Sequence, residues 1–384
     1  MIAGRMLQSR TAPEAATLIG RGKVEELAGA VRDLPAETVI FDQDLTPTQQ
    51  RNLEKAIGSK VIDRTQLILD IFASRARTRE GRLQVELAQL NYMLPRLAGR
   101  GVEMSRLGGG IGTRGPGETQ LETDRRRIAR RIKKLEDELE GVRAGRALHR
   151  QRRSAVPLPT LALAGYTNAG KSTLFNRLTQ AGVLADAKMF ATLDPTVRPL
   201  VLPSRRRVLV SDTVGFIRNL PTTLVKAFRA TLEEVKEAAL ILHVVDVSAP
   251  QAAEHTAHVH KVLAEIGAAE IPQLLVMNKV DRLPDAEVDV EALRSRLLGA
   301  RDARAVAVSS LTGAGVDHLL ARIDELLPLD PIIHTTLRLP LGDGATLALL
   351  HEFGRVVATQ YDADGCEVEA EIPESLCRRL QVRK

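Results

Sequence analysis

Hydrophobic positions change their spacing along the chain, and these changes divide it into segments. Residues 1–78 alternate helical patterns with two short apolar runs, Thr38 to Phe41 and Val61 to Ile62. The first run is followed by turn-forming residues from Asp42 to Pro47. Alternation of this kind is typical of strands that are connected by helices, so we expect a small N-terminal α/β domain over residues 1–78.

The next segment, residues 79–156, carries two apolar stripes with helical spacing. The stripes are Leu83, Leu87, Leu90, Leu94 and Leu97, and then Leu121, Ile128, Ile132, Leu135 and Leu139. Intervals of three, four or seven residues place each set on one face of a helix. Two helices joined by a glycine-rich connection, Gly99 to Gly117, can bury such stripes only against each other or against a neighbouring element. The pattern predicts an antiparallel helical hairpin with a glycine-rich tip.

Residues 157–328 repeat the order strand, loop, helix after the helix-breaking Pro157 and Pro159. The apolar runs that predict strands are Leu161 to Ala164, Val208 to Ser211, Ala239 to Val245, Gln273 to Met277 and Ala305 to Val308. Continuous apolar runs are typical of a parallel sheet with helices on both faces. A last segment, residues 329–384, has strand-like runs at Ile332 to Leu337 and Val368 to Ile372 and is expected to be a small C-terminal α/β domain.

One motif in the third segment has a specific chemical meaning. Gly165-Tyr-Thr-Asn-Ala-Gly-Lys-Ser172 matches G-x-x-x-x-G-K-S and lies between an apolar strand and the helical run Thr173 to Leu178. Glycines let backbone N–H groups face phosphates, and the helix presents its positive end to them. Lys171 is expected to reach the β and γ phosphates, and Ser172 to bind Mg²⁺. The motif predicts a P-loop nucleotide-binding domain with a mostly parallel sheet.

Three further segments follow in the order of a guanine-nucleotide switch. Asp212-Thr-Val-Gly215 ends a strand, where the acid can hold the metal through water and the glycine N–H can meet the γ-phosphate. Asn278-Lys-Val-Asp281 ends another strand, and its last carboxylate can accept both N–H donors of guanine, which adenine lacks. Ser309-Ser-Leu311 ends the last strand, where a backbone N–H can meet the guanine carbonyl. The ligand is therefore expected to be GTP or GDP, which disfavours an ATP-driven enzyme.

A loop that closes over the γ-phosphate needs a threonine hydroxyl on Mg²⁺. Phe190-Ala-Thr-Leu-Asp-Pro-Thr196 lies in the right place, and both Thr192 and Thr196 qualify. Phe216 follows Gly215, where many GTPases carry a Gln that orients the attacking water. Because Phe216 has no hydrogen-bonding group, we expect slow intrinsic hydrolysis that depends on a docked partner.

Charge is concentrated in the helical hairpin. Between Arg96 and Arg153 there are 16 Lys and Arg residues against 8 Asp and Glu, a local excess of +8 in a chain of net charge +6, so the remainder carries −2. A concentrated positive segment predicts a polyanionic partner, usually nucleic acid, and the alternative is a solvated helix face. Arg100, Arg106 and Arg114 among the tip glycines favour phosphate contact.

Composition excludes some classes of protein. The 384 residues include no apolar run that suits a signal peptide or a membrane span, so we expect a cytoplasmic protein. Cys366 and Cys377 lack the spacing of a metal site or a disulfide framework, and we expect buried thiols in a reducing compartment. A monomer is the default expectation.

The chain resembles the HflX family of ribosome-associated GTPases over nearly its whole length. The matching pieces are Leu18-Ile-Gly-Arg-Gly-Lys-Val24, Asn52-Leu-Glu54, Asp63-Arg-Thr65, Gln84-Val-Glu-Leu-Ala88, Gly108-Gly-Gly-Ile-Gly-Thr-Arg-Gly-Pro-Gly-Glu-Thr-Gln120, the P-loop and Phe190-Ala-Thr-Leu-Asp194. The resemblance implies that the hairpin enters the large ribosomal subunit and contacts ribosomal RNA, that ribosomes stimulate GTP hydrolysis, and that the protein splits or rescues stalled ribosomes. It also favours Thr192 over Thr196 as the metal ligand.

Two departures from the family are visible. Members of the family usually carry more chain ahead of the first matching piece, including what looks like a first strand, whereas only Met1 to Thr17 precede it here. Either that strand is replaced or the N-terminal sheet has an exposed edge. Ser-Ser-Leu also replaces the commoner Ser-Ala-Lys at residues 309–311, which weakens packing on the guanine ring.

An alternative function is an RNA-binding ribosome assembly factor in which the nucleotide only regulates affinity.

The candidate catalytic residues are Lys171, Thr192 and Gly215, and the candidate metal ligands are Ser172 and Thr192. The candidate nucleotide contacts are Gly165, Tyr166, Thr167, Asn168, Ala169, Gly170, Lys171, Ser172, Phe190, Ala191, Thr192, Leu193, Asp194, Asp212, Thr213, Val214, Gly215, Asn278, Lys279, Val280, Asp281, Ser309, Ser310 and Leu311.

Overall fold

The computed structural model describes residues 2–34, 36–97, 116–153, 158–180, 196–216, 234–283, 289–298, 304–327, 330–362 and 365–382. These residues fall into two units, one that extends to Val142 and one that begins at Arg143. The boundary lies inside one long helix. The four-part division expected from the sequence stays a prediction. Among the residues just named, no helix combines the length and the apolar character that a membrane crossing requires.

The first unit begins with an α/β fold around two parallel strands. Its elements are α1 (Arg21–Asp33), β1 (Thr38–Phe41), α2 (Pro47–Ile57), β2 (Lys60–Asp63) and α3 (Arg64–Arg75). Both predicted strands are confirmed, and they pair in parallel from Thr38 opposite Lys60 to Phe41 opposite Asp63. Among the described strands β1 pairs only with β2, and Ile40 of β1 is 54% exposed.

Local sequence explains where α2 begins and ends. Thr46 accepts a hydrogen bond from the Gln49 N–H, and the Gln49 side chain accepts one from the Thr46 N–H. This reciprocal cap satisfies donors that the first turn leaves open, and Pro47 at the first position has no N–H to satisfy. Gly58 ends the helix in the left-handed conformation at φ 75°.

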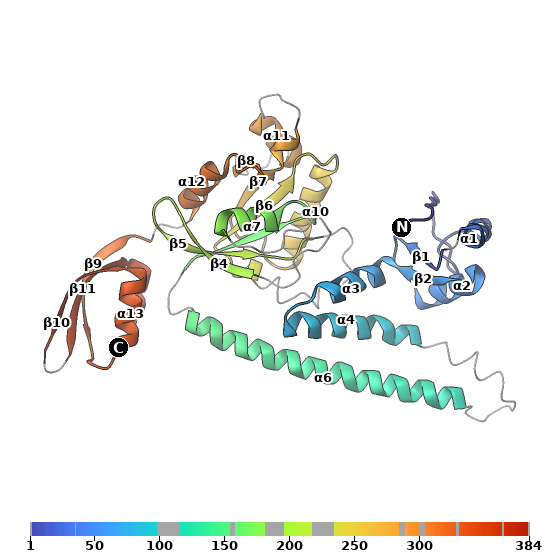
Figure 1. Ribbon diagram of the computed structural model, residues 1–384, viewed down its shortest axis with the longest axis horizontal. Helices are drawn as coiled ribbons and strands as arrows, with labels where there is room; N and C mark the ends of the chain where they lie inside the picture. The colour runs from blue at the N-terminus through green and yellow to red at the C-terminus, as the bar shows by residue number, and fades with distance from the viewer. Residues whose placement is uncertain are drawn as a thin grey trace. The chain divides into compact units, whose positions relative to one another are not determined.

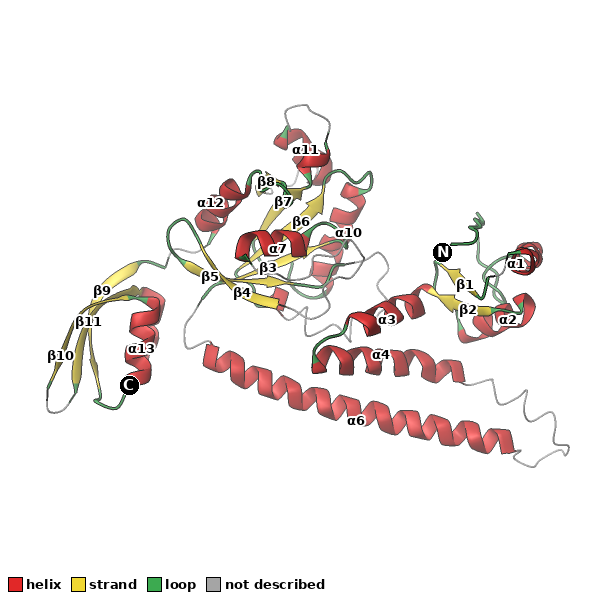
Figure 2. Ribbon diagram, in the orientation of Figure 1, coloured by secondary structure: helices red, strands yellow, loops and turns green. Residues whose placement is uncertain are grey.

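The first unit also contains α4 (Arg79–Leu97) and the part of α6 (Pro116–Arg153) that precedes Arg143. Leu83 of α4 is buried with Leu135 and Leu139 of α6. Glu86 bonds to Arg131, and Arg79 lies 3.7 Å from Glu138, so residue numbers fall along one helix as they rise along the other. The predicted antiparallel pairing is confirmed, and Figures 1 and 2 show the two helices side by side.

The buried surface of α4 is wider than the predicted stripe. Val85, Ala88 and Tyr92 are also buried, on a face that the leucine pattern does not include. The helix packs against α2 and α3 as well as α6, so it needs apolar side chains on two sides. The glycine-rich tip lies outside the described residues.

The second unit contains a six-stranded sheet that carries the nucleotide motifs. Its elements are β3 (Thr160–Gly165), α7 (Lys171–Thr179), β4 (Thr196–Val201), β5 (Arg207–Asp212), β6 (Leu240–Asp246), α10 (Ala252–Glu265), β7 (Gln273–Asn278), the 3₁₀ turn η1 (Val280–Arg282), α11 (Val290–Leu298), β8 (Arg304–Val308) and α12 (Val316–Leu326). The strand order is β4-β5-β3-β6-β7-β8, and β4 pairs antiparallel to β5 while the other pairs are parallel. The five predicted strands are confirmed.

Helices cover both faces of this sheet (Figure 1). On one face Phe175 of α7 and Ile323 of α12 share a fully buried core with Leu163 and Val244 of the central strands. On the other face Ala252 of α10 and residues of α11 pack on β6 and β7. Strands buried on both faces explain the continuous apolar runs of the sequence.

The antiparallel edge strand β4 was missing from the sequence prediction. Pro199 lies within it, and most of its side chains are exposed or half-buried. An edge strand tolerates proline because one side of its backbone needs no ladder bonds. Such a strand lacks the continuous apolar run that marks the others.

The last residues form a separate three-stranded antiparallel sheet. Its elements are β9 (Ile332–Leu339), α13 (Gly344–Phe353), β10 (Arg355–Tyr361), β11 (Cys366–Pro373) and α14 (Glu374–Val382), with strand order β10-β11-β9. Cys366 and Cys377 are free and buried in the core between the sheet and its helices, which confirms the expectation of buried thiols.

Candidate functional site

The predicted nucleotide segments meet at the carboxyl ends of the parallel strands of the six-stranded sheet. The P-loop follows β3, the Asp212 segment ends β5, the Asn278 segment ends β7 and the Ser309 segment follows β8. These strands are parallel, so their carboxyl ends lie at the same edge. In open α/β sheets this edge is where ligands bind.

Glycines shape the P-loop where a side chain does not fit. Gly165 has φ 154°, and a Cβ there would lie 2.3 Å from the carbonyl oxygen of Val244. Gly170 has φ 97°, and a Cβ there would lie 2.2 Å from Nδ2 of Asn278. Gly170 also precedes the first turn of α7, whose open backbone N–H groups carry partial positive charge. The loop is therefore built to present amides to an anion.

Lys171 is buried beneath this loop. Its Nζ donates hydrogen bonds to the carbonyl oxygens of Gly165 at 3.1 Å and Tyr166 at 2.9 Å. Burial lowers the pKa of Lys171 to about 8, and the Asp212 carboxylate partly opposes that shift. The ammonium group is thus held next to the loop amides, where a phosphate would restore its ordinary preference for the charged form.

Ser172 and Asp212 bring two oxygen donors together. The Ser172 hydroxyl donates to Asp212 Oδ2 at 2.7 Å, and Asp212 is fully buried. The neighbouring Thr213 hydroxyl donates to the Leu163 carbonyl oxygen at 2.5 Å, which fixes the end of β5 against β3. Hydroxyl and carboxylate oxygens are the ligands that Mg²⁺ prefers, so this pair fits that cation.

The segment after Asp212 is tied to the P-loop. The Phe216 N–H donates to the Gly165 carbonyl oxygen at 3.0 Å, and the Thr167 N–H donates to the Phe216 carbonyl oxygen at 2.8 Å. Gly215 lies so close to Lys171 that a Cβ would be 2.9 Å from its Nζ. Phe216 is 3% exposed, so its ring belongs to the buried core.

Asn278 joins the P-loop to the loop that follows β8. Its Nδ2 donates to the Ala169 carbonyl oxygen at 2.8 Å. Its Oδ1 accepts hydrogen bonds from the backbone N–H of Ser310 at 3.0 Å and from the Ser310 hydroxyl at 2.8 Å. Nearby, the Ser309 hydroxyl donates to Asp281 Oδ1 at 2.5 Å, which orients the carboxylate expected to bind guanine.

Lys279 makes a second link between these segments. It adopts a left-handed conformation at φ 67°, and its Nζ donates to the Asn168 carbonyl oxygen at 2.7 Å and to Asp246 Oδ2 at 2.6 Å. Burial opposes ionisation of Asp246, but the hydrogen bonds from Lys279 and Ser248 outweigh it and lower the pKa of that carboxyl. Asp246 therefore stays charged and holds Lys279 over the loop.

Sequence reasoning missed three residues of this site. Asp246 ends β6 directly after an apolar run, a signal as visible as that of Asp212. Arg177 of α7 donates to the carbonyl oxygens of Ser310 and Leu311, but nothing in the sequence connects α7 with that loop. His255 of α10 stacks on the Tyr166 ring with centroids 3.8 Å apart, and no motif marks it.

Some predicted residues lie elsewhere or beyond the described ranges. Phe190, Ala191, Thr192, Leu193 and Asp194 fall outside the described residues, and so does the γ-phosphate loop they were expected to form. Thr196, the alternative metal ligand, begins β4 and is paired with Asp212. Leu311 is largely exposed, and Val280 packs against the core beside β7.

A P-loop that follows a parallel strand, together with an Asp-x-x-Gly and an Asn-Lys-x-Asp segment at the same sheet edge, defines a P-loop GTPase. Residues 160–279 match the family model described as 50S ribosome-binding GTPase. Residues 1–73 match the model of the GTP-binding GTPase N-terminal region, and residues 75–153 match that of the GTP-binding GTPase middle region.

Curated relatives match almost the whole chain. GTPase HflX of Caldanaerobacter subterraneus subsp. tengcongensis is 48% identical over 99% of this chain and 86% of its own length. GTPase HflX of Escherichia coli K12 is 46% identical over 97% of this chain and 86% of its own length. The chain therefore belongs to the HflX family of GTPases. A solved GTP-binding protein from Sulfolobus solfataricus in complex with GDP is 25% identical, with a TM-score of 0.46, over 83% of this chain and 88% of that one.

Proposed function

We propose that this GTPase acts on the large ribosomal subunit, where it splits or rescues stalled ribosomes, and that the subunit stimulates its hydrolysis of GTP. The observation that carries the proposal is a nucleotide site in the same chain as a helix with an exposed basic face. A cytoplasmic monomer that contacts ribosomal RNA fits this activity.

The basic face lies on the first half of α6. Leu135 and Leu139 of this helix are buried against α4. The cationic side chains Arg125, Arg126, Arg127, Arg130, Lys133 and Lys134 are exposed. Exposed cationic side chains that the packing partner does not cover remain available to RNA phosphates. The helix therefore separates a face for folding from a face for a polyanion.

The nucleotide roles follow from the contacts around the P-loop. The amides near Gly170 and the ammonium of Lys171 would hold the phosphates, and the N–H of Gly215 would meet the γ-phosphate. Ser172 would bind Mg²⁺ directly, with Asp212 acting through water and Thr192 as a further ligand. The cation neutralises charge that develops on the phosphates when it is bound.

Guanine selection rests on two of the motifs. Asp281 would accept the two N–H donors of the base, with its carboxylate oriented by Ser309. The N–H of Ser310 would turn from Asn278 to the guanine carbonyl oxygen. Because Asn278 also bonds to Ala169, base and phosphate recognition are mechanically connected.

Slow intrinsic turnover follows from Phe216. A buried ring offers no hydrogen bond to the attacking water, and its backbone N–H and C=O are committed to Gly165 and Thr167. The water must be oriented by another group, and we propose that docking on the large subunit supplies or orders it.

The decisive experiment measures GTP hydrolysis with and without large ribosomal subunits across a salt series. We expect strong stimulation that falls as salt rises, because counterion release governs binding to RNA. Replacing Arg125, Arg126 and Arg127 with Gln should flatten the salt dependence and raise the subunit concentration required. Stimulation that ignores salt, or no stimulation at all, would refute the proposal.

A matched control comes from the same helix. Glu136, Asp137 and Glu140 are exposed acids on α6 downstream of the basic face. Neutralising these three residues should leave subunit affinity unchanged or increase it, since it raises the net charge of the helix whereas the arginine substitutions lower it.

A hydrolysis-deficient variant that still binds GTP should remain trapped on the subunit, whereas an assembly factor that uses nucleotide only for affinity would still leave.

A further inference from the structure

Asp63 is a fully buried carboxylate at the end of β2. Its Oδ1 accepts the Gln66 N–H at 2.8 Å and so caps α3, and its Oδ2 accepts the Leu45 N–H at 3.1 Å. A buried carboxylate needs a cation or several donors to remain charged. The cation comes from another element, because Arg96 Nη2 lies 3.1 Å from the same Oδ2.

Arg96 belongs to the last turn of α4, and its guanidinium group is nearly saturated with partners. Its Nε donates to Gln50 Oε1 at 3.0 Å, and its Nη1 donates to the Tyr92 carbonyl oxygen at 3.0 Å. Its Nη2 donates to the Leu45 carbonyl oxygen at 2.7 Å as well as to Asp63. The group also stacks on the Tyr92 ring, 3.4 Å from the centroid.

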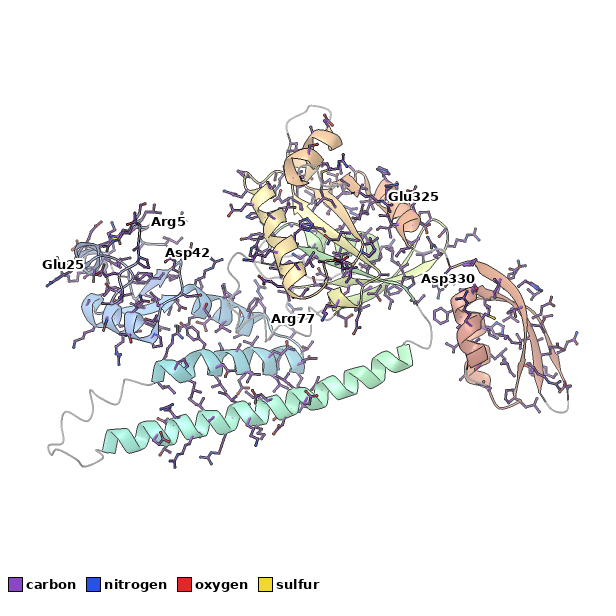
Figure 3. The ribbon with its side chains drawn as sticks, turned by 180° about the vertical axis from the view of Figure 1, so that it is seen from behind. Arg5, Glu25, Asp42, Arg77, Glu325 and Asp330 are labelled. Atoms are coloured by element: carbon purple, nitrogen blue, oxygen red, sulfur yellow. The ribbon has the colours of Figure 1, made fainter. Side chains whose placement is uncertain are left out.

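Arg96 contacts Asp63 at the carboxyl end of the parallel strand β2. The carboxyl ends of parallel strands are where small α/β folds bind ligands. Here β2 ends in Asp63, and β1 ends just before Asp42, which is labelled in Figure 3. The α4 helix therefore inserts one of its own cations at the end of β2, where other folds place a ligand.

The part of α4 that precedes Arg96 in sequence, around Leu83 and Glu86, packs against α6. Arg131 of α6 forms two hydrogen bonds with the Glu86 carboxylate, at 2.7 and 2.8 Å. Leu83 and Leu135 are buried at the same contact. A continuous chain of contacts thus runs from Asp63 through α4 to the helix that carries the basic face.

We propose that Asp63 and Arg96 are a positioning pair that fixes the basic face of α6 on the N-terminal α/β fold, and that subunit-stimulated GTP hydrolysis depends on it. The inference rests on the proposed function above. It also gives a role to the Asp63-Arg-Thr65 piece, which lies far in sequence from the nucleotide motifs. Both residues of the pair lie in the first unit, whereas the P-loop lies in the second, so we expect intrinsic hydrolysis to be independent of the pair.

The pair needs a guanidinium group. Lysine keeps the charge but has one nitrogen on a flexible stem, whereas Arg96 reaches four acceptors from three nitrogens in a fixed plane. The Arg96→Lys variant should therefore retain the fold and lose orientation. Arg96→Gln and Asp63→Asn remove the ion pair itself.

The test measures intrinsic GTP hydrolysis and the concentration of large subunits that gives half-maximal stimulation. We expect intrinsic hydrolysis to be unchanged in all variants, and the half-maximal concentration to rise roughly tenfold in Arg96→Gln, with an intermediate rise in Arg96→Lys. Guanidinium ions at millimolar concentration should partly restore an Arg96→Ala variant. A control, Arg10→Gln, breaks an exposed ion pair with Glu14 in the same unit and should have no effect.

The two proposals fail in different ways. If wild-type protein shows no stimulation by subunits, the proposed function is wrong. Suppose instead that wild-type protein is stimulated and that thermal unfolding of Arg96→Lys is unchanged. If both Arg96→Lys and Asp63→Asn then give the wild-type dependence of hydrolysis on subunit concentration, the positioning inference is overturned. Hydrogen exchange of the last turn of α4, which should accelerate in Arg96→Lys, supplies a check that needs no ribosome.

Discussion

The hydroxyl of Ser172 donates a hydrogen bond to the buried carboxylate of Asp212 over 2.7 Å. The first residue belongs to the first turn of α7 and the second ends β5, so the P-loop and the following motif are aligned through side chains as well as through the sheet. Two oxygen donors in this arrangement suit a cation that Ser172 binds directly and Asp212 holds through water. The relationship makes a prediction about magnesium.

Replacing Ser172 with Ala should lower kcat/KM for GTP on the order of 100-fold in the presence of Mg²⁺, because one charge-assisted contact worth about 3 kcal/mol is lost. The remaining activity should depend less steeply on magnesium concentration. Hydrolysis rates across a magnesium titration measure both effects.

The matched control is Thr179→Ala, which removes a hydroxyl from the same helix that bonds to the Phe175 carbonyl oxygen. It should leave the magnesium dependence intact. An unchanged magnesium titration in Ser172→Ala would rule out Ser172 as a metal ligand.

The second prediction concerns the base. Asp281→Asn should weaken GDP binding by roughly 100-fold or more and strengthen binding of xanthosine diphosphate, because a site built for hydrogen bonds rejects a mismatched partner strongly. The reason is that an amide offers one acceptor and one donor side, whereas guanine needs two acceptors. Calorimetry with both nucleotides measures the reversal. Asp317→Asn, at an exposed position in α12, should change neither affinity.

The local pattern of the chain was enough to predict most of the fold that holds this site. Parallel strands such as β3 and β7 are buried on both faces, so their apolar runs are unambiguous. The edge strand β4 contains Pro199 and faces solvent, and so it shows no such run. Edge strands depend on their neighbour for pairing, which a local pattern cannot register.

The same limit applies to the site. Motif spacing predicted Lys171, Asp212 and Asn278 because each motif is contiguous in sequence. Arg177 and His255 act across elements that only the folded sheet brings together, one on the Ser310 loop and one on the Tyr166 ring. Their residue types and spacing carry no local signal, so no reading of the chain alone could have selected them.

The pH dependence of nucleotide binding follows from Lys171. Burial lowers its pKa to about 8 from 10.5, against the opposing effect of Asp212. The unfolded chain therefore binds more protons between these values, and stability of the nucleotide-free protein should rise with pH across that window. Phosphate favours the charged form, so GDP affinity should be constant below pH 8 and fall above it, with uptake of a proton on binding.

Calorimetric titration of GDP between pH 7 and pH 9.5, in two buffers with different ionisation enthalpies, measures this proton uptake. The Lys171→Met variant should bind weakly and lose the pH dependence. Affinity that stays flat up to pH 9.5 would show that Lys171 keeps its ordinary pKa in the free protein.

The last prediction concerns Phe216, which stands where other GTPases place a water-orienting Gln. Introducing that glutamine should not speed intrinsic hydrolysis, because the side chain at this position is 3% exposed and its backbone is held by Gly165 and Thr167. A buried amide without partners should instead lower the free energy of unfolding by about 1 to 3 kcal/mol. Phe216→Leu keeps an apolar side chain and should retain most of the stability and the same slow rate. Single-turnover GTP hydrolysis and urea unfolding measure the two properties. A tenfold or greater gain in the intrinsic rate of Phe216→Gln would mean that this segment leaves the P-loop when GTP binds, and the partner would then be needed for a different step.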